Sequence, residues 1–138
     1  MRCYNKGVKK ILLIFFLFNL TSAGVFAQVR ISEIMYDLEG TDTKHEWVEV
    51  ENTGSNDIDI SSWKLFENDT NHKLTHIEGT ATLVPGAFAI IADDAATFLA
   101  DWPSFSGPLF DSSFSLKNAG ELLEIRDADL VSQDQVTY

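Results

Sequence analysis

The chain has 138 residues, enough for one ordinary domain, and carries 21 acidic against 10 basic residues, a formal net charge of −11. A surface this acidic repels polyphosphate, so direct nucleic-acid binding through phosphate contacts is not expected. The single cysteine, Cys3, offers no disulfide, and the fold must therefore be held by a hydrophobic core.

Residues 1–27 are predicted to be a secretory signal peptide. The first ten residues are basic, residues 11–20 are nearly all apolar, and small residues precede a cleavage site after Ala27. The apolar stretch is too short for a membrane anchor, which needs roughly 20 residues. Four of the ten Lys and Arg residues and none of the 21 acidic residues lie in this segment, so the remaining chain has a net charge of −15. The expected location is secreted or at the cell surface, without a transmembrane span after cleavage.

The first strand is predicted over residues 29–36. Ile31 and Ile34 have odd spacing, which indicates either a β-bulge or a strand buried on both faces. Residues 37–44 form a polar loop. The sequence therefore places a strand with one irregularity directly after the signal peptide.

A second strand is predicted over residues 45–52, where Val48 and Val50 fall on one face and Trp47 on the other. Alternation with one polar face is typical of a half-buried strand. Trp47, together with Tyr36, is either an exposed aromatic anchor for a partner or packs beneath a neighbouring loop. The residues that follow, 53–57, are a turn cluster.

The middle of the chain continues with short strands. Ile58 and Ile60 precede a turn, residues 63–67 form a strand, and residues 67–73 are predicted as a polar loop. Strands over residues 80–83 and 87–92 flank Pro85-Gly86, which suits the central positions of a type II turn because glycine accepts the positive φ. A hairpin is expected there.

Residues 93–102 form the one predicted helix, capped by Asp93 or Asp94 and stopped by Pro103. Phe98, Leu99 and Trp102 share one side of it.

After a Ser/Gly/Pro loop, strands are predicted over residues 113–116 and 121–126, and a last strand begins near Gln135. The sequence stops at Tyr138 inside that strand, so the domain is expected to be truncated at its C-terminus, with an open sheet edge. Many short strands with turn signals and little helix predict an all-β sandwich or barrel for residues 28–138.

Five motifs in order resemble the lamin tail domain, an immunoglobulin-like β-sandwich found in nuclear lamins and in secreted bacterial and archaeal proteins. They lie in residues 31–37, 46–52, 58–65, 82–86 and 114–121. The resemblance covers about residues 29–138 and implies a module without shared catalytic residues. It also implies structural roles in the core or in turns for Val48, Val50, Asn52, Trp63, Pro85 and Gly86.

Carboxylates offer the main alternative chemistry. Glu33, which is expected to be partly buried beside Arg30 or Arg126, and Glu46 and Glu49 are candidates for an acid or a metal ligand. A weak Ca²⁺ site is conceivable in the acidic loop, although its spacing is not that of an EF-hand. Its candidate ligands are Asp37, Glu39, Asp42 and Glu46.

Other catalytic signals are weak. His45, His72 and His76 lack the spacing of a zinc site. No nucleophile elbow or phosphate-binding glycine loop is present. The chain is therefore not expected to be an enzyme or to need a cofactor.

Three functions remain open at this stage. The first is a non-catalytic binding or architectural module of a secreted or cell-surface protein, with a protein, a glycan or the cell envelope as its partner. The second is the accessory domain of an exported hydrolase, a nuclease or phosphatase, whose catalytic part lies beyond Tyr138. The third is a Ca²⁺-stabilised surface adhesion module.

Overall fold

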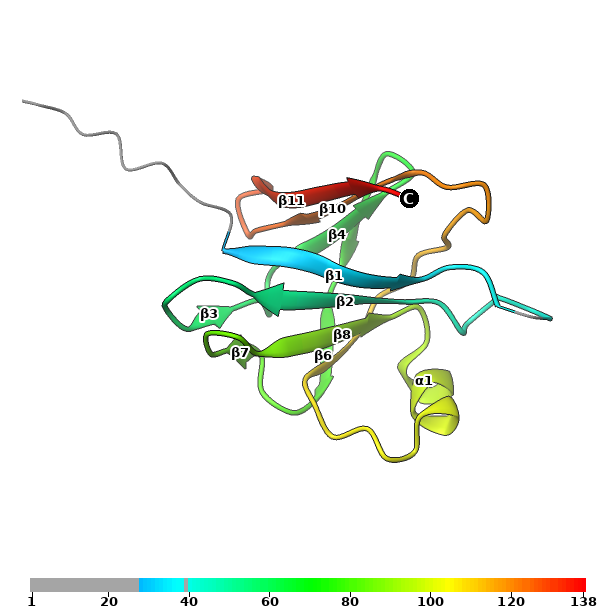
Figure 1. The fold of residues 1–138 in the computed structure, drawn as a ribbon, viewed down its shortest axis with the longest axis horizontal. Helices are drawn as coiled ribbons and strands as arrows, with labels where there is room; N and C mark the ends of the chain where they lie inside the picture. Colours follow the sequence, from blue (N-terminus) through cyan, green and yellow to red (C-terminus); the bar gives the residue numbers. More distant parts are fainter. Residues whose placement is uncertain (1–27, 39) are drawn as a thin grey trace, which may run out of the picture.

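The computed structural model describes residues 28–38 and 40–138. The predicted signal peptide and Glu39 lie outside the described residues. Two β-sheets pack against each other as a sandwich, and a short strand pair lies at one end (Figure 1). The predicted all-β, immunoglobulin-like sandwich with one short helix is confirmed.

The strands divide between the sheets as follows. The five-stranded sheet has the order β1 (Val29–Met35), β2 (Trp47–Asn52), β8 (Phe88–Ala92), β9 (Leu109–Asp111) and β6 (Thr75–Glu78). The four-stranded sheet has the order β11 (Ser132–Thr137), β10 (Leu122–Arg126), β4 (Lys64–Glu67) and β5 (Thr70–Lys73). The end pair is β3 (Ile58–Asp59) with β7 (Thr82–Leu83). Within residues 28–38 and 40–138, only the β8–β9 pairing is parallel, and helix α1 (Ala95–Asp101) lies in the connection between these two strands.

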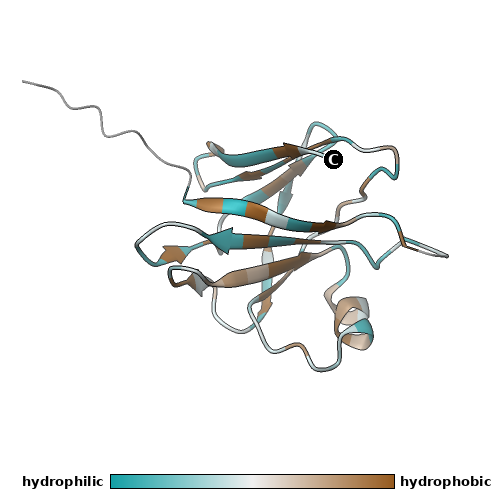
Figure 2. Cartoon of the chain, in the orientation of Figure 1, coloured by the Kyte–Doolittle hydropathy of each residue, from teal (hydrophilic) through white to brown (hydrophobic). Residues whose placement is uncertain are grey.

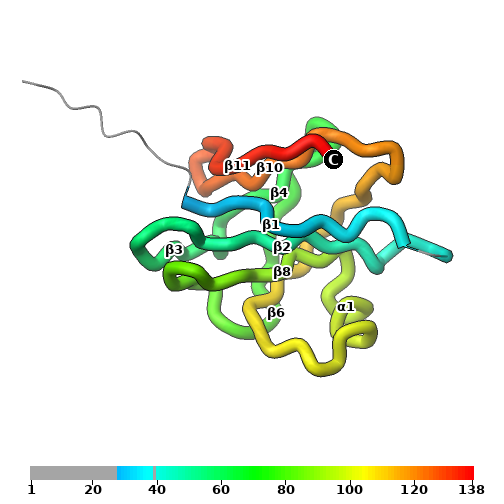
Figure 3. The backbone as a smooth tube through the Cα atoms, viewed as in Figure 1, coloured from blue at the N-terminus to red at the C-terminus, as the bar shows by residue number. Residues whose placement is uncertain are grey.

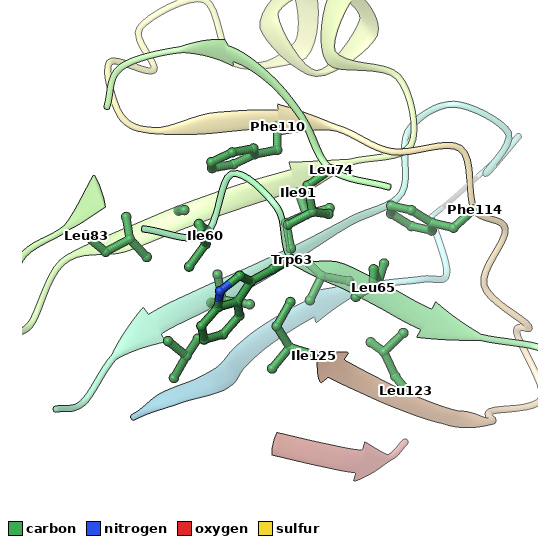
Figure 4. Close-up of a cluster of buried hydrophobic side chains, with 14 of the residues drawn as sticks. Ile60, Trp63, Leu65, Leu74, Leu83, Ile91, Phe110, Phe114, Leu123 and Ile125 are labelled. Atoms are coloured by element: carbon green, nitrogen blue, oxygen red, sulfur yellow. The ribbon is translucent and has the colours of Figure 1, made fainter. Parts of the chain in front are cut away.

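The main core lies between the two sheets (Figure 4). Trp63, Leu65 and Ile125 reach it from the four-stranded side, while Ile91 and Phe110 reach it from the five-stranded side. These side chains are almost completely removed from water. Burial of apolar surface on this scale supplies the folding free energy that a disulfide provides in many small exported domains.

The five-stranded sheet is also covered on its outer face. A second apolar cluster joins Trp47, Ile90 and Leu109 of the sheet to Ala95 and Phe98 of α1. Trp47 is only 7% exposed, so the prediction of a half-buried β2 is wrong at this residue, which helix α1 covers. Glu49 and Glu51, further along the same face, are partly exposed, so the rest of the strand is half-buried as predicted. Hydropathy follows this arrangement, because β8 is apolar along nearly its whole length (Figure 2).

The irregular spacing in the first strand is explained by a bulge. The pairing of β1 with β2 shifts register between Ile31 and Glu33. The extra residue lets both Ile31 and Ile34 pack on the core. The same shift leaves Glu33 exposed, so its predicted partial burial is wrong. Arg30 instead pairs with Glu51 at 2.6 Å.

Three segments were predicted incorrectly. Residues 67–73 are not a loop, because β5 pairs with β4 through a tight turn in which Asn68 and Asp69 have φ of 44° and 59°. Residues 113–116 form no strand, whereas the segment predicted as a Ser/Gly/Pro loop contains β9. β9 is only three residues long, which hides its apolar character among the flanking turn residues.

The Pro85-Gly86 turn forms as predicted, with Gly86 at φ 77° and a 2.9 Å hydrogen bond from Ala87 N–H to the Val84 carbonyl. The expected hairpin does not form. β7 pairs with β3, and β8 pairs with β2 and β9. The turn therefore carries the chain from one sheet to another.

The first and last strands lie side by side (Figure 3). The Ile31 N–H donates to the Asp134 carboxylate at 2.8 Å, which links the two sheets at one edge of the sandwich. α1, the one helix of the described residues, is too short to cross a bilayer.

Candidate binding groove

A groove with a volume of about 550 Å³ lies on the outer face of the five-stranded sheet, beside α1 and the loop that follows it. In Figure 1, β1, β2 and β8 of this sheet lie side by side, and α1 and the yellow loop that follows it lie next to β8. The sheet, the helix and the loop all contribute apolar side chains, and three carboxylates lie among them. The residues used below are Trp47, Ile90, Phe98, Trp102 and Phe105, with Glu33, Glu49 and Asp101. We call this surface the aromatic groove.

Four aromatic rings make one continuous cluster in the groove. Trp47 contacts Phe98 and Trp102 edge-on, at centroid distances of 6.2 and 6.3 Å. Phe105 meets Phe98 edge-on at 5.1 Å. These are favourable geometries for aromatic pairs. Trp102 is nevertheless 50% exposed, whereas Trp47 and Phe98 are buried, so the cluster is packed at its base and open to solvent at Trp102.

Helix α1 forms one wall of this groove, and hydrogen bonds at its N-terminus fix it against the sheet. The Asp94 side chain accepts from Thr97 N–H at 2.9 Å, and this hydrogen bond, together with those from the Thr97 and Lys44 side chains, lowers the pKa of Asp94 to about 2. The Asp111 carboxylate of β9 accepts from Ala95 N–H at 2.9 Å. Both backbone donors are free at a helix start, so the two carboxylates fix the helix against the sheet.

The loop carrying Phe105 is positioned by a close backbone approach at Gly79. Gly79 has φ +76°, and a Cβ there would lie 2.8 Å from the Gly107 carbonyl oxygen and from two backbone atoms of Pro108. Only glycine satisfies both the left-handed conformation and this contact.

Gly79→Ala is therefore expected to destabilise the fold by about 2 kcal/mol or more, since a strained φ and a backbone clash add together. Chemical denaturation monitored by circular dichroism measures this. Gly86→Ala is the matched control, because Gly86 also has positive φ but a Cβ there meets nothing within 4 Å. Equal losses in both variants would show that the close approach contributes nothing.

The charged side chains that line the groove, among the residues that the structure describes, are all acidic. They are Glu33, Glu49 and Asp101, and no described Lys or Arg lines it. The Glu49 carboxylate accepts from the Ser32 hydroxyl at 2.8 Å, and His45 lies 2.6 Å from Asp101 through its Nδ1. These contacts hold two of the carboxylates in place while leaving Glu33 exposed.

The acidic loop proposed for Ca²⁺ lies elsewhere. The carboxylates of Asp37 and Asp42 both accept from the Asn118 side chain, at 3.3 and 2.8 Å. The Glu46 carboxylate is turned inward and accepts from Leu116 N–H at 3.0 Å. Glu39 lies outside the described residues. Across residues 28–38 and 40–138, no three His, Cys, Asp or Glu side chains gather in a group able to hold a metal ion.

Burial raises the pKa of Glu46, against the lowering effect of the Leu116 N–H. A raised folded-state pKa means that the native protein binds the proton more tightly than the unfolded chain. The stability contributed by the neutral carboxyl is full below the unfolded pKa and is lost as pH rises through the folded one.

Glu46→Gln is accordingly expected to raise the melting temperature at pH 7, because the amide oxygen still accepts from Leu116 N–H without a buried charge. The gain should vanish below about pH 4, where Glu46 is neutral in both states. Thermal melts from pH 3 to 8 test this. A constant difference across the range would contradict it.

The three histidines occupy separate environments. His45 contacts Asp101, His72 lies 3.2 Å from the buried Glu67, and His76 packs on Phe110 at a centroid distance of 5.3 Å. The described chain does not bring them together.

Trp47 and Tyr36, the two predicted aromatic anchors, lie in different places. Trp47 packs beneath α1, and the Tyr36 ring packs on the Tyr138 ring at a centroid distance of 4.6 Å.

Comparison with known families decides what the sandwich is. The model of the family described as Lamin Tail Domain matches residues 23–138. The chain belongs to the lamin tail domain family. No curated protein matches it. Lamin tail domains are non-enzymatic immunoglobulin-like modules.

Several of the sequence-predicted structural residues meet at one corner of this lamin tail domain. The buried Asn52 side chain donates to the carbonyls of Asn56 and Leu83 at 2.8 and 2.7 Å, and accepts from Gly54 N–H at 2.9 Å. Its backbone carbonyl accepts from Gly86 N–H at 2.8 Å. Asn52 thus fixes the 53–57 turn, the end of β7 and the Pro85-Gly86 turn. Val48, Val50 and Trp63 lie in the main core.

The aromatic groove itself was not predicted as a site. The signal available in the sequence was the shared side of Phe98 and Trp102 on the predicted helix. Phe105 and Asp101 gave no signal, because a loop position and a helix end carry no periodicity that places them against Trp47.

Proposed function

We propose that this lamin tail domain is a non-catalytic binding module of a secreted or cell-surface protein, and that the aromatic groove is its contact surface. The observation that carries the proposal is Trp102, half exposed on top of a packed aromatic cluster. A large exposed aromatic on a rigid base is typical of the residues that dominate binding energy at interfaces.

The surroundings support a binding role. Strands and a capped helix form most of the groove, and the loop after the helix is fixed through Phe105, which packs on Phe98. Less conformational entropy is lost when a partner binds a surface that is already ordered. The predicted signal peptide and the strongly acidic composition suit a module that works outside the cell. Its partner is then another protein, a glycan or the cell envelope.

The test compares two exposed aromatic side chains, Trp102 in the groove and Phe88 outside it. Trp102→Ala removes the groove aromatic, whereas Phe88→Ala removes a side chain that is 45% exposed and does not line the groove. The labelled mature chain is incubated with cell envelopes and with the secreted protein fraction of the source organism. Retained label is measured together with circular dichroism, which establishes that both variants are folded.

We expect retention of the wild-type and Phe88→Ala proteins and a loss of about tenfold in affinity for Trp102→Ala, the size typical of an interface aromatic. Equal retention of all three proteins would remove the groove from the proposal. Absence of wild-type retention in both fractions would overturn the binding role itself.

A further inference from the structure

The charge pattern of the aromatic groove points to the chemistry of its occupant. We propose that the groove binds a cationic side chain, a lysine or arginine presented by a basic partner protein, with the cation held between the Trp102 ring and the carboxylates. This inference rests on the proposed function and specifies its partner.

The first step is the one-sided charge. Glu33 and Glu49 project from neighbouring positions on β1 and β2, where they are paired across the strands. Asp101 faces the same groove from the end of α1. Like charges at close range repel, and a bound cation relieves that repulsion while a neutral or anionic ligand does not.

The second step is the aromatic surface next to these carboxylates. Trp102 and Phe98 stack at a centroid distance of 6.4 Å with an interplanar angle of 28°. Tryptophan is the aromatic that attracts cations most strongly, through the negative face of its ring. The aliphatic stem of a lysine or arginine side chain also covers apolar surface while its charged end reaches the carboxylates.

The third step is that the chain already makes this kind of contact within its own fold. On the four-stranded sheet, the Arg126 guanidinium lies 3.4 Å from the centroid of the Phe66 ring and donates to both Glu124 oxygens, at 2.9 and 3.0 Å. An aromatic ring with a flanking carboxylate is satisfied there by an internal arginine. In the aromatic groove, the same combination of groups lines an open surface.

Competing occupants fit less well. A nucleic acid or an acidic peptide would place its charge beside three carboxylates. A glycan would stack on Trp102 but would gain nothing from the negative charge of the groove.

The experiment uses the mature chain and a capped ten-residue peptide of alternating Lys and Ser. Binding is followed by tryptophan fluorescence and isothermal titration calorimetry at low and physiological salt. The matched peptides carry ε-acetyl-lysine or Glu in place of Lys, and a tetramer of β-1,4-linked N-acetylglucosamine represents a glycan. We expect the Lys peptide alone to bind, with an affinity that falls as salt rises.

Two double variants with the same change in net charge separate site binding from general attraction. Glu33→Gln/Glu49→Gln removes two groove carboxylates, and Asp57→Asn/Asp129→Asn removes two exposed carboxylates that do not line it. We expect the first to weaken Lys-peptide binding by about tenfold and the second by less than about twofold. Trp102→Ala should weaken it about fivefold.

Each other result overturns the inference. Equal losses in the two double variants mean attraction by net charge. If the acetylated peptide or the oligosaccharide binds, and binds equally well to Glu33→Gln/Glu49→Gln, the groove takes a neutral ligand. Envelope or protein retention that depends on Trp102 but survives Glu33→Gln/Glu49→Gln rejects the cationic occupant and leaves the proposed binding function standing.

Discussion

Replacing Asn52 by alanine is expected to destabilise the domain by about 3 kcal/mol, because three hydrogen bonds are lost and the buried Leu83 carbonyl is left without its side-chain donor. Chains of this size are typically stable by only about 5–15 kcal/mol, so the melting temperature should fall by roughly 10 °C. Thermal and urea melts measure the change.

Two further variants make the interpretation specific. Asn52→Asp keeps the shape and the acceptor for Gly54 N–H but cannot donate while ionised, so its loss should be largest at neutral pH and smaller in acid. Asn56→Ala keeps the backbone carbonyl that accepts from Asn52, and Asn56 is exposed. It should change stability by less than about 0.5 kcal/mol. A loss in Asn56→Ala as large as that in Asn52→Ala would contradict the role assigned to the buried amide.

The second large effect is expected at Phe110, whose side chain is fully buried in the main core. Phe110→Ala should cost about 3–5 kcal/mol, since it removes a large apolar group and leaves a cavity in a sandwich closed on both sides. Equilibrium urea denaturation gives the free energy of unfolding directly.

Phe110→Leu should recover most of that loss, because it restores much of the volume. Phe88→Ala should cost far less, because that ring is already 45% exposed. Similar losses for Phe110→Ala and Phe88→Ala would mean that the core tolerates a cavity at β9.

Local chemistry made part of the fold predictable. The Pro85-Gly86 turn, the irregularity between Ile31 and Glu33 and the short helix ending before Pro103 each depend on residues close together in the sequence. Such features depend on turn stereochemistry, on one extra residue in a strand and on a capping side chain. Each of these can be identified in the sequence without knowledge of the tertiary structure.

The errors share the opposite cause. β5, which was predicted as a loop, is a polar strand at the edge of its sheet, so no alternating apolar pattern distinguishes it from a loop. β9 is buried, but three residues are too few for an apolar pattern to identify a strand. Trp47 was assigned to the outer face correctly, yet what covers that face is a helix more than 40 residues further along the chain. This coverage is a long-range tertiary contact, which the periodicity of the β2 sequence cannot predict.

The groove shows the same division. The sequence predicted that Phe98 and Trp102 lie on the same side of the helix. The three groove carboxylates, in contrast, come from three separate elements, β1, β2 and α1. Glu33 was predicted to be partly buried, and Glu49 was considered with Glu33 and Glu46 as a candidate acid or metal ligand. Only the bulge in β1 and the crossover through α1 bring both beside Trp102.

The hydrogen bond between Ile31 N–H and the Asp134 carboxylate spans 103 residues, so it cannot form until nearly the whole domain has been synthesised. At about 5–20 residues per second, a ribosome needs roughly 5 to 20 seconds after making β1 to deliver the residue that locks it to the opposite sheet. Contacts this distant in sequence also make folding slow once the chain is complete. If the chain is exported, as we propose, slow folding favours export, because a narrow translocation pore accepts an unfolded chain and not a closed β-sandwich.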